Sequence, residues 1–305
     1  MKILIGTSSF GVADDAPLRT LEAAGIDVVM NPYGRKIDDA ELPALLSDDT
    51  VGIIAGLETL DRPTLSTSGI RVVSRVGAGM SNVDLEAARE LGVLVYSTPD
   101  APTRAVAELT LGAMLSLLRQ LPPMDRDMHA GKWVRRLGRQ LDQRTVAIIG
   151  FGRVGRRLAS LLAPFGTRVV VVAPSLEEVH TDGLPVLTLD DALAQADIVT
   201  VHASGDERIL DERAFSLLRE RTLVLNAARG ACISEPALIA ALDSGRVAGA
   251  WIDTFEQEPY SGPLAAYDNV LLTPHVGSNT IECRVEMEQD AVDHLLTGLA
   301  KLGLR

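Results

Sequence analysis

Aromatic residues, cysteines and long apolar runs are all scarce in this chain of 305 residues. Phe, Trp and Tyr make up only 4% of the residues, so aliphatic side chains must form the core, and a hydrophobic content of 47% supplies enough of them. The two cysteines, Cys232 and Cys283, lack the spacing of a disulfide framework or a metal motif. We therefore expect free thiols in a reducing cytosol and no metal site.

Basic residues are outnumbered by acidic ones, and the formal net charge is −12 at pH 7. That balance disfavours nonspecific binding to nucleic acid or to an anionic membrane. No apolar run reaches the roughly 18 residues that a membrane span needs. The chain begins with the strand-like Lys2-Ile3-Leu4-Ile5 and not with a signal peptide. The expectation is a cytoplasmic protein that binds neither nucleic acid nor membrane.

A glycine motif follows a buried strand in the stretch T-V-A-I-I-G-F-G-R-V-G, which starts at Thr145. The apolar run lacks alternation, as in a strand covered on both faces, and helical spacing follows it. Gly150, Gly152 and Gly155 supply G-x-G-x-x-G, which permits a sharp turn, a close pyrophosphate and tight helix packing. Alone, the motif could be an ordinary glycine-rich loop. Between a strand and a helix N-terminus, it favours dinucleotide binding.

The length permits two domains, and strands alternate with helices along the chain. The first domain is predicted to have strands at 2–5, 27–30, 51–54, 71–74 and 93–95, and helices at 16–24, 37–46 and 83–91. A long helix at 103–118, stopped near Pro122-Pro123, leads to the second. There we predict strands at 146–149, 168–172, 198–201, 223–225, 247–251 and 270–272, with helices at 190–195 and 236–242 among those between them.

Six such strands are what a doubly wound dinucleotide fold requires. A last helix at 281–299 follows the completed sheet and is expected to return to the first domain. The fold class is therefore predicted as α/β, with a Rossmann-type doubly wound parallel sheet domain and a smaller flavodoxin-like α/β substrate domain. Residues 1–100 and 280–305 would form the substrate domain, and residues 101–279 the NAD(P)-binding domain.

Charged residues follow three predicted strands, where ligands bind in such folds. These are Arg229, Asp253, Glu258 and His275. Oxidation of a 2-hydroxy acid needs a base that works near pH 7, which is the natural role of His. A carboxylate can orient that imidazole and favour its protonated form, and a guanidinium can grip the substrate's carboxylate. Each residue also has an ordinary alternative: a surface histidine, a solvated acid, an ion-pair partner, or an acid that caps a turn.

Longer motifs resemble the D-isomer-specific 2-hydroxyacid dehydrogenases over nearly the whole chain. They include N-A-A-R-G, V-A-G-A-W-I-D-T-F-E-Q-E-P and D-N-V-L-L-T-P-H-V-G, with R-V-G-A-G-M-S-N-V-D-L-E-A-A and A-V-A-E-L-T-L-G upstream. N-P-Y-G-R-K and I-I-A-G-L-E-T-L look closest to the short phosphoglycerate-dehydrogenase-like members. The resemblance implies an NAD(P)-dependent oxidoreductase that is a homodimer, with residues 103–118 and 131–133 at its interface. A Trp at position 133 is equally compatible with a structural role.

The resemblance also implies roles for matching residues. Arg229, Glu258 and His275 would be catalytic, with His275 as general acid and base and Glu258 as its partner. Asp253 would contact the nicotinamide carboxamide. The expected substrate-binding residues are Val76, Gly77, Ala78, Gly79, Arg229 and His275, although the loop 76–79 could be a simple tight turn. The expected cofactor-binding residues are Gly150, Gly152, Arg153, Val154, Gly155, Ala173, His202, Ala227, Ala228, Arg229, Asp253, His275 and Gly277.

Some positions depart from the pattern. The acid that binds the adenosine ribose is missing, because Ala173-Pro174-Ser175 stands in its place and Glu177 and Glu178 come late. No Arg follows at once for a 2′-phosphate either, so NAD is favoured over NADP. Ala55 stands where phosphoglycerate-specific relatives have a phosphate-binding Arg, although Arg35, Lys36 or Arg75 could compensate.

The predicted function is hydride transfer between a nicotinamide cofactor and a D-2-hydroxy acid or 2-oxo acid of the phosphoglycerate, glyoxylate or hydroxypyruvate type. The alternative is a non-catalytic NAD(H)-sensing protein like the corepressor branch of the family. The intact set of Arg229, Glu258 and His275 is compatible with both, whereas the acidic charge favours the enzyme.

Overall fold

The computed structural model describes residues 1–173, 181 and 183–305. The chain forms two compact units, one made of Met1–Pro102 with Ser278–Arg305 and the other of Thr103–Gly277. The sequence-based boundaries follow residues 100 and 279. Each unit contains its own parallel sheet and is described by itself. Assignment of substrate binding to the first unit and nucleotide binding to the second stays a prediction.

The first unit is built on a parallel five-stranded sheet with the order β2-β1-β3-β4-β5. This is the strand order of flavodoxin-like folds, in which the order reverses between the first and third strands. The strands are β1 (Lys2–Ile5), β2 (Asp27–Met30), β3 (Thr50–Ala55), β4 (Val72–Arg75) and β5 (Leu94–Ser97).

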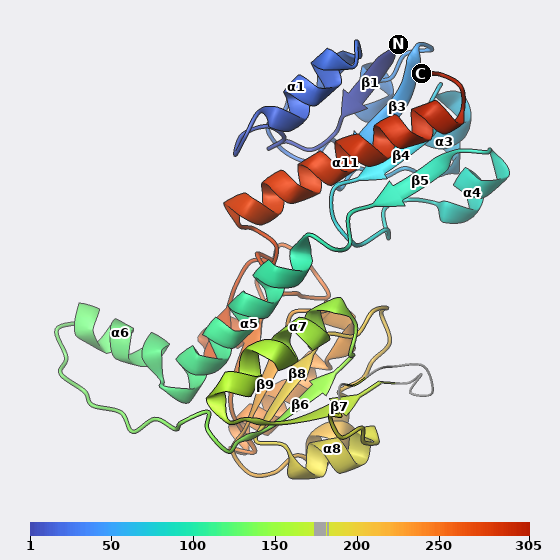
Figure 1. The fold of residues 1–305 in the computed structure, drawn as a ribbon. Coiled ribbons are helices and arrows are strands. Elements are labelled where there is room, and N and C mark those ends of the chain that lie inside the picture. Colours follow the sequence, from blue (N-terminus) through green and yellow to red (C-terminus); the bar gives the residue numbers. More distant parts are fainter. Residues whose placement is uncertain (174–180, 182) are drawn as a thin grey trace. The chain divides into compact units, whose positions relative to one another are not determined.

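Helices cover both faces of this sheet (Figure 1). They are α1 (Ala16–Ala23), α2 (Leu42–Leu45), α3 (Arg62–Thr67), α4 (Leu85–Glu90) and α11 (Ile281–Lys301). α11 packs on α1, β3, β4 and β5, while side chains of α2, α3 and α4 share a core with Ile53 and Val73. Because successive strand residues face opposite sides, Val72 meets α11 at Gly298, where an added Cβ would lie 2.7 Å from Val72 Cγ1.

The described residues of the second unit form a parallel six-stranded sheet with the order β11-β10-β9-β8-β6-β7. Its strands are β6 (Thr145–Ile149), β7 (Arg168–Val172), β8 (Ile198–Val201), β9 (Thr222–Asn226), β10 (Val247–Ile252) and β11 (Val270–Leu272). Val171 N donates to Pro185 O and Leu187 N donates to Val171 O, both at 2.9 Å, so Val186 forms a parallel bridge beyond β7. With that bridge, the sheet has the dinucleotide-fold order plus one edge strand. The predicted fold class is confirmed.

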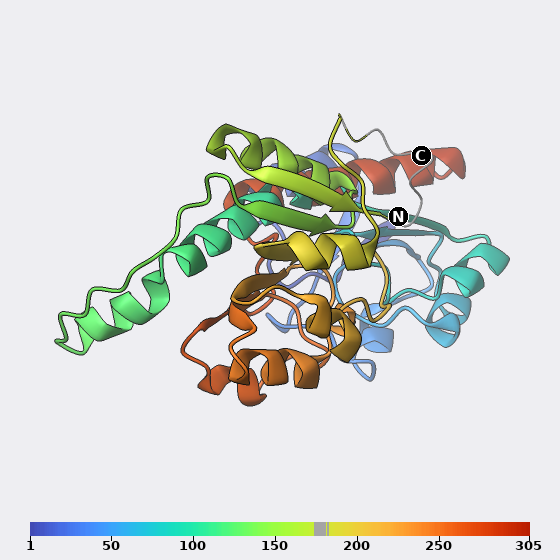
Figure 2. The ribbon, with the colours of Figure 1, turned by 90° about the horizontal axis from the view of Figure 1, so that it is seen from below.

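Two helical layers enclose this second sheet (Figures 1 and 2). The helices are α5 (Pro102–Leu118), α6 (Leu121–His129), α7 (Arg153–Leu162), α8 (Leu189–Gln195), α9 (Glu212–Leu217) and α10 (Glu235–Asp243), with short turns η1 (Ala163–Phe165), η2 (Gly230–Cys232) and η3 (Pro263–Ala266). Buried side chains of α5 and α7 pack against one face of the sheet, and those of α8, α9 and α10 pack against the other. In both views α6 stands away from the sheet of its unit.

One sequence-based helix prediction was wrong at a proline, and one helix that begins at prolines was not predicted. The helix expected at 37–46 spans only Leu42–Leu45, with Pro43 in its first turn, and Ile37 lies buried outside it. The helix expected at 103–118 does end at Leu118, before Pro122 and Pro123, but these two prolines also lie in the first turn of a further helix, α6. Proline suits a first helical turn because the N–H groups there have no partner within the helix.

Across the described ranges, with their gaps at 174–180 and 182, no helix combines the length and apolar character that crossing a membrane requires.

The glycine motif offers a matched pair of substitutions. An added Cβ at Gly155 would lie 2.3 Å from Gly150 O, whereas one at Gly152 would meet nothing within 4 Å. Because the Gly155 clash is with backbone, Gly155→Ala is expected to lower the free energy of unfolding by about 2 kcal/mol. Gly152→Ala should change it by less than about 1 kcal/mol. Urea denaturation measures both, and equal losses in the two variants would contradict this packing.

Candidate active site

The loop from β6 into α7 lies at the carboxyl ends of the strands, at the point where the strand order of the sheet reverses. β6 has β7 on one side and β8 on the other, and the carboxyl ends of such strands form the ligand crevice of this fold. Gly150 follows β6 with a φ of 91°, and an added Cβ there would lie 2.5 Å from Ala203 N. Gly152 caps α7 without a side chain, and the space beside it is open. This cradle fits the pyrophosphate of a dinucleotide at a helix N-terminus.

His202 and Ala173 lie at the same edge. Ala173 directly follows β7 and is buried, while His202 follows β8, and its N–H donates to Ile149 O at 2.7 Å. His202 Nε2 lies 2.9 Å from Thr200 Oγ1. Burial lowers the pKa of His202 to about 4, so the ring is neutral near pH 7. The other residues considered for the ribose, Pro174, Ser175, Glu177 and Glu178, lie outside the described residues.

Asn226 shapes the loop that carries Arg229. The buried amide of Asn226 donates to Arg229 O at 2.9 Å and accepts from Ala228 N at 3.1 Å. Gly230 follows, and an added Cβ there would lie 2.0 Å from the carbonyl carbon of Phe255, so the β9 and β10 loops touch. Arg229 itself is exposed and donates from Nη1 to Ala228 O at 2.8 Å. The role of Asn226 depends on these hydrogen bonds, which the residue pattern N-A-A-R-G does not reveal.

Asp253, just after β10, holds the loop after β11. Its carboxylate is 1% exposed and accepts hydrogen bonds from Thr273 Oγ1 at 2.5 Å, Val276 N at 2.9 Å and Gly277 N at 2.9 Å. Its carbonyl oxygen accepts from His275 N at 2.9 Å. The turn-capping role weighed in the sequence analysis is therefore present. A contact between Asp253 and a nicotinamide carboxamide stays a prediction.

Glu258 and His275 form the central pair. Glu258 Oε2 lies 2.9 Å from His275 Nδ1, and Glu258 Oε1 accepts from Phe255 N at 3.0 Å. His275 has a φ of 53°, an uncommon backbone conformation for a residue other than glycine, which is often found at functional sites. With Nδ1 directed at the carboxylate, Nε2 is the ring nitrogen left for proton exchange with a ligand.

The predicted catalytic trio is gathered in part. Arg229, Glu258 and His275 follow β9, β10 and β11, which are neighbours at one carboxyl edge. Glu258 and His275 are in contact. Within the part of the chain that the structure describes, Arg229 makes no hydrogen bond or ion pair with either of them.

The predicted substrate loop of the first unit has fewer available donors than expected. Val76 N donates to Ala55 O at 2.9 Å and Gly77 N donates to Thr98 Oγ1 at 2.7 Å. Those two N–H groups are therefore engaged within the chain, and the role of this loop in substrate binding stays a prediction. Among the described residues, the N–H groups of Ala78 and Gly79 have no acceptor.

Outside the gaps at 174–180 and 182, no group of His, Cys, Asp and Glu side chains is arranged to hold a metal ion.

One family profile matches residues 111–277, with the description D-isomer specific 2-hydroxyacid dehydrogenase, NAD binding domain. Among curated proteins, D-3-phosphoglycerate dehydrogenase of Rattus norvegicus is 34% identical over 292 residues, which are 93% of this chain and 54% of the relative. The chain thus spans about half the length of the curated relatives that it matches.

Solved structures are similar over nearly the whole chain. A protein from Thermus thermophilus is 31% identical, with a TM-score of 0.89 over 99% of this chain and 97% of its own. An NADPH-dependent glyoxylate/hydroxypyruvate reductase from Sinorhizobium meliloti is 28% identical, with a TM-score of 0.83 over 96% of this chain and 92% of its own.

The half-buried His202 gives the second unit a predicted pH dependence. His202 has a pKa of about 4 in the folded chain, against 6.5 ordinarily, so the unfolded chain binds more protons between these values. Stability conferred by the neutral ring is therefore present above about pH 6.5 and lost as the pH falls towards 4, by at most about 3 kcal/mol. His202→Gln should flatten this slope in urea denaturation from pH 7 to 4. An unchanged slope would show that another group is responsible.

Proposed function

We propose that this chain, which belongs to the D-isomer-specific 2-hydroxyacid dehydrogenase family, transfers a hydride between a nicotinamide cofactor and a D-2-hydroxy acid or 2-oxo acid. The observation that carries the proposal is the contact between Glu258 and His275, 2.9 Å long, on the strand ends beside the Arg229 loop. A base held by an acid, with a guanidinium on a neighbouring strand end, is what this reaction needs.

His275 is proposed as the general acid and base. A reduced nicotinamide held beside these residues would supply the hydride that reduces C2 of the 2-oxo acid. His275 Nε2 gives its proton to the C2 oxygen, and the product is the 2-hydroxy acid; oxidation reverses both transfers. Glu258 holds Nδ1 and so keeps Nε2 available. The Phe255 N–H donates to Glu258 Oε1, and the His275 N–H donates to Asp253 O, so both members of the pair are limited in movement.

Arg229 is proposed to bind the substrate's carboxylate and C2 oxygen through its planar guanidinium. The Arg229 side chain is exposed, and the Asn226 amide holds the Arg229 backbone in place. The guanidinium therefore extends from a fixed backbone position. In the first unit, the N–H groups of Ala78 and Gly79 are the donors that the predicted substrate loop has available.

An unphosphorylated substrate fits the first unit best. Arg35 is paired with Glu41 at 2.7 Å and with Asp38 at 3.2 Å, and Arg75 donates to Val76 O at 2.7 Å. Two of the three cations that could replace a phosphate-binding Arg at Ala55 therefore already have partners. We propose glyoxylate or hydroxypyruvate as the substrate type, in preference to the phosphorylated acid.

NAD is the proposed cofactor. Ala173, buried at the end of β7, supplies neither an acid for a ribose hydroxyl nor a cation for a 2′-phosphate.

We further propose a cytoplasmic homodimer. Trp133, Val134 and Leu137, after α6, are 80%, 45% and 94% exposed, and a second copy would cover these apolar side chains.

A reduction screen tests the proposed reaction. Glyoxylate, hydroxypyruvate, pyruvate and phosphohydroxypyruvate are each offered with NADH and with NADPH, and loss of nucleotide absorbance is followed. The expected result is turnover with NADH that is fastest for glyoxylate or hydroxypyruvate. Nucleotide binding without turnover of any 2-oxo acid would instead support the non-catalytic sensor.

Substitution of the proposed acid and base gives a sharper test in the same assay. His275→Ala should lower kcat by at least about a hundredfold, the usual contribution of a positioned acid or base. Affinity for NADH, measured by fluorescence titration, should change little. His129→Ala is the matched control, because the His129 side chain is 82% exposed on α6. A His275→Ala variant with near-normal kcat would remove this residue from the mechanism.

A further inference from the structure

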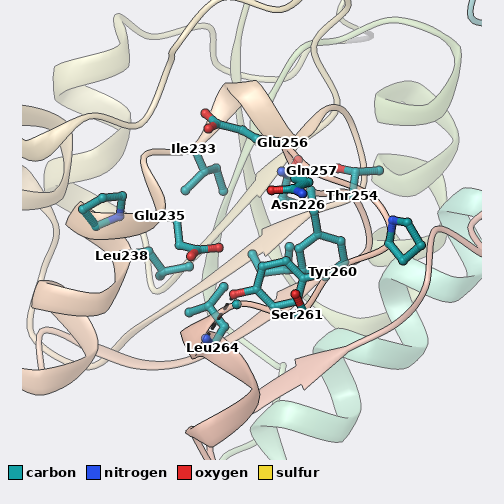
Figure 3. Close-up of a pocket in the computed structure, with 16 residues that line it drawn as sticks. Asn226, Ile233, Glu235, Leu238, Thr254, Glu256, Gln257, Tyr260, Ser261 and Leu264 are labelled. Carbon is teal, nitrogen blue, oxygen red and sulfur yellow. Dashed lines mark hydrogen bonds between the residues drawn. The ribbon is translucent and has the colours of Figure 1, made fainter.

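A cavity of about 460 Å³ lies in the second unit between η2, the first turn of α10 and residues 254–264 (Figure 3). Its size is typical of a small-molecule site. Gln257 and Pro259, the neighbours of Glu258 in the chain, line it. Arg229, Glu258 and His275 are not among the described residues that do so, which separates the cavity from the proposed catalytic groups.

The charged side chains that line the cavity are both acidic. Glu256 is paired with Arg208, while Glu235 lies half-buried at the start of α10. The lining found in the described chain contains no Lys, Arg or His. Figure 3 shows the Glu235 carboxylate close to the Tyr260 hydroxyl, which hydrogen-bonds to it. Burial, with a smaller effect of Glu235, raises the pKa of Tyr260 to about 12, so the phenol remains a donor.

The remaining lining is aromatic and aliphatic. Tyr260 stacks on Phe255 with ring centroids 4.2 Å apart and planes 20° apart. Gly262 makes room for that ring, since an added Cβ would lie 2.5 Å from it. Ile233 and Leu238 supply buried apolar surface. A carboxylate attracts an organic cation, and an aromatic face nearby adds to that attraction.

We propose that this cavity binds a small organic ammonium compound, with its charged end at Glu235 and its apolar body against Tyr260, Ile233 and Leu238. Thr254, another lining residue, has a buried Oγ1 without a hydrogen-bond partner in the described chain. Neutral and anionic compounds of the same shape bind less tightly, because only the cation gains from the carboxylate.

A ligand in the cavity would affect the proposed catalytic pair, Glu258 and His275, through Phe255. That residue lines the cavity, and its N–H donates to Glu258 Oε1 at 3.0 Å. A ligand that holds Phe255 in place therefore also holds Glu258 against His275. This regulatory role rests on the proposed function, whereas the binding itself does not.

Binding is tested on the whole chain without cofactor or substrate, so it is independent of any oxidoreductase activity. The probes are 2-phenylethylammonium, 2-phenylethanol and 3-phenylpropionate, followed by ligand-observed NMR and calorimetry. We expect saturable binding of the ammonium, about fivefold tighter than the alcohol, and weakest binding of the carboxylate. Hydrogen exchange at Phe255 N–H should slow severalfold in the ammonium complex.

Glu235→Gln should abolish the advantage of the ammonium over the alcohol. Glu220→Gln is the matched control, because the Glu220 side chain is 73% exposed elsewhere on the same unit, and it should keep that advantage. If Glu235→Gln does not fold, Ser261→Phe tests the site instead, because Ser261 is an exposed residue that lines the cavity. Loss of ammonium binding in Ser261→Phe supports the site, and retained binding overturns it. Equal affinities for the three probes, no saturable binding, or an advantage that survives Glu235→Gln would overturn the site. Unchanged exchange at Phe255 in a complex that does form would overturn the link to Glu258.

Discussion

The contact between His275 Nδ1 and Glu258 Oε2, 2.9 Å long, is the interaction on which the proposed chemistry depends. It leaves Nε2 as the imidazole nitrogen that is available to a ligand. Neither partner is held by its side chain alone. Phe255 N–H holds the other oxygen of Glu258, and Asp253 O accepts from the backbone of His275, whose φ of 53° is imposed by the loop around it. The ring orientation is therefore a property of the sheet edge.

Buried polar groups hold the loops, and exposed charged groups extend from them. Asp253, 1% exposed, satisfies three donors of the loop that contains His275. Asn226, also 1% exposed, satisfies one donor and one acceptor of the loop that contains Arg229. Such groups are costly to bury unless they are bonded, so these loops have few alternative conformations. Proton transfer is sensitive to small displacements, and a rigid support of this kind suits it.

Local patterns in the sequence predicted the strands and the glycine motif because apolar periodicity and turn residues act over a few positions. The convergence of Glu258 and His275 followed from one rule, that parallel strands share a carboxyl edge. No structural role was predicted for Asn226, and Asp253 was predicted mainly as a ligand contact. The hydrogen bonds of both residues join segments that come together only when the chain folds. The bond from the Gly77 N–H was not predicted for the same reason: its acceptor, Thr98, follows a different strand. The helix start at Pro43 was interpreted as helix interior, and the helix that begins beside Pro122 was not predicted.

The tautomer of His275 tests the central claim most directly. Nitrogen NMR of the histidine side chains, assigned by comparison with a His275→Gln sample, reports which ring nitrogen carries the proton when the ring is neutral. The contact with Glu258 predicts the proton on Nδ1 and an unprotonated Nε2. A neutral ring with its proton on Nε2 would contradict the proposed role of Glu258 and, with it, the mechanism.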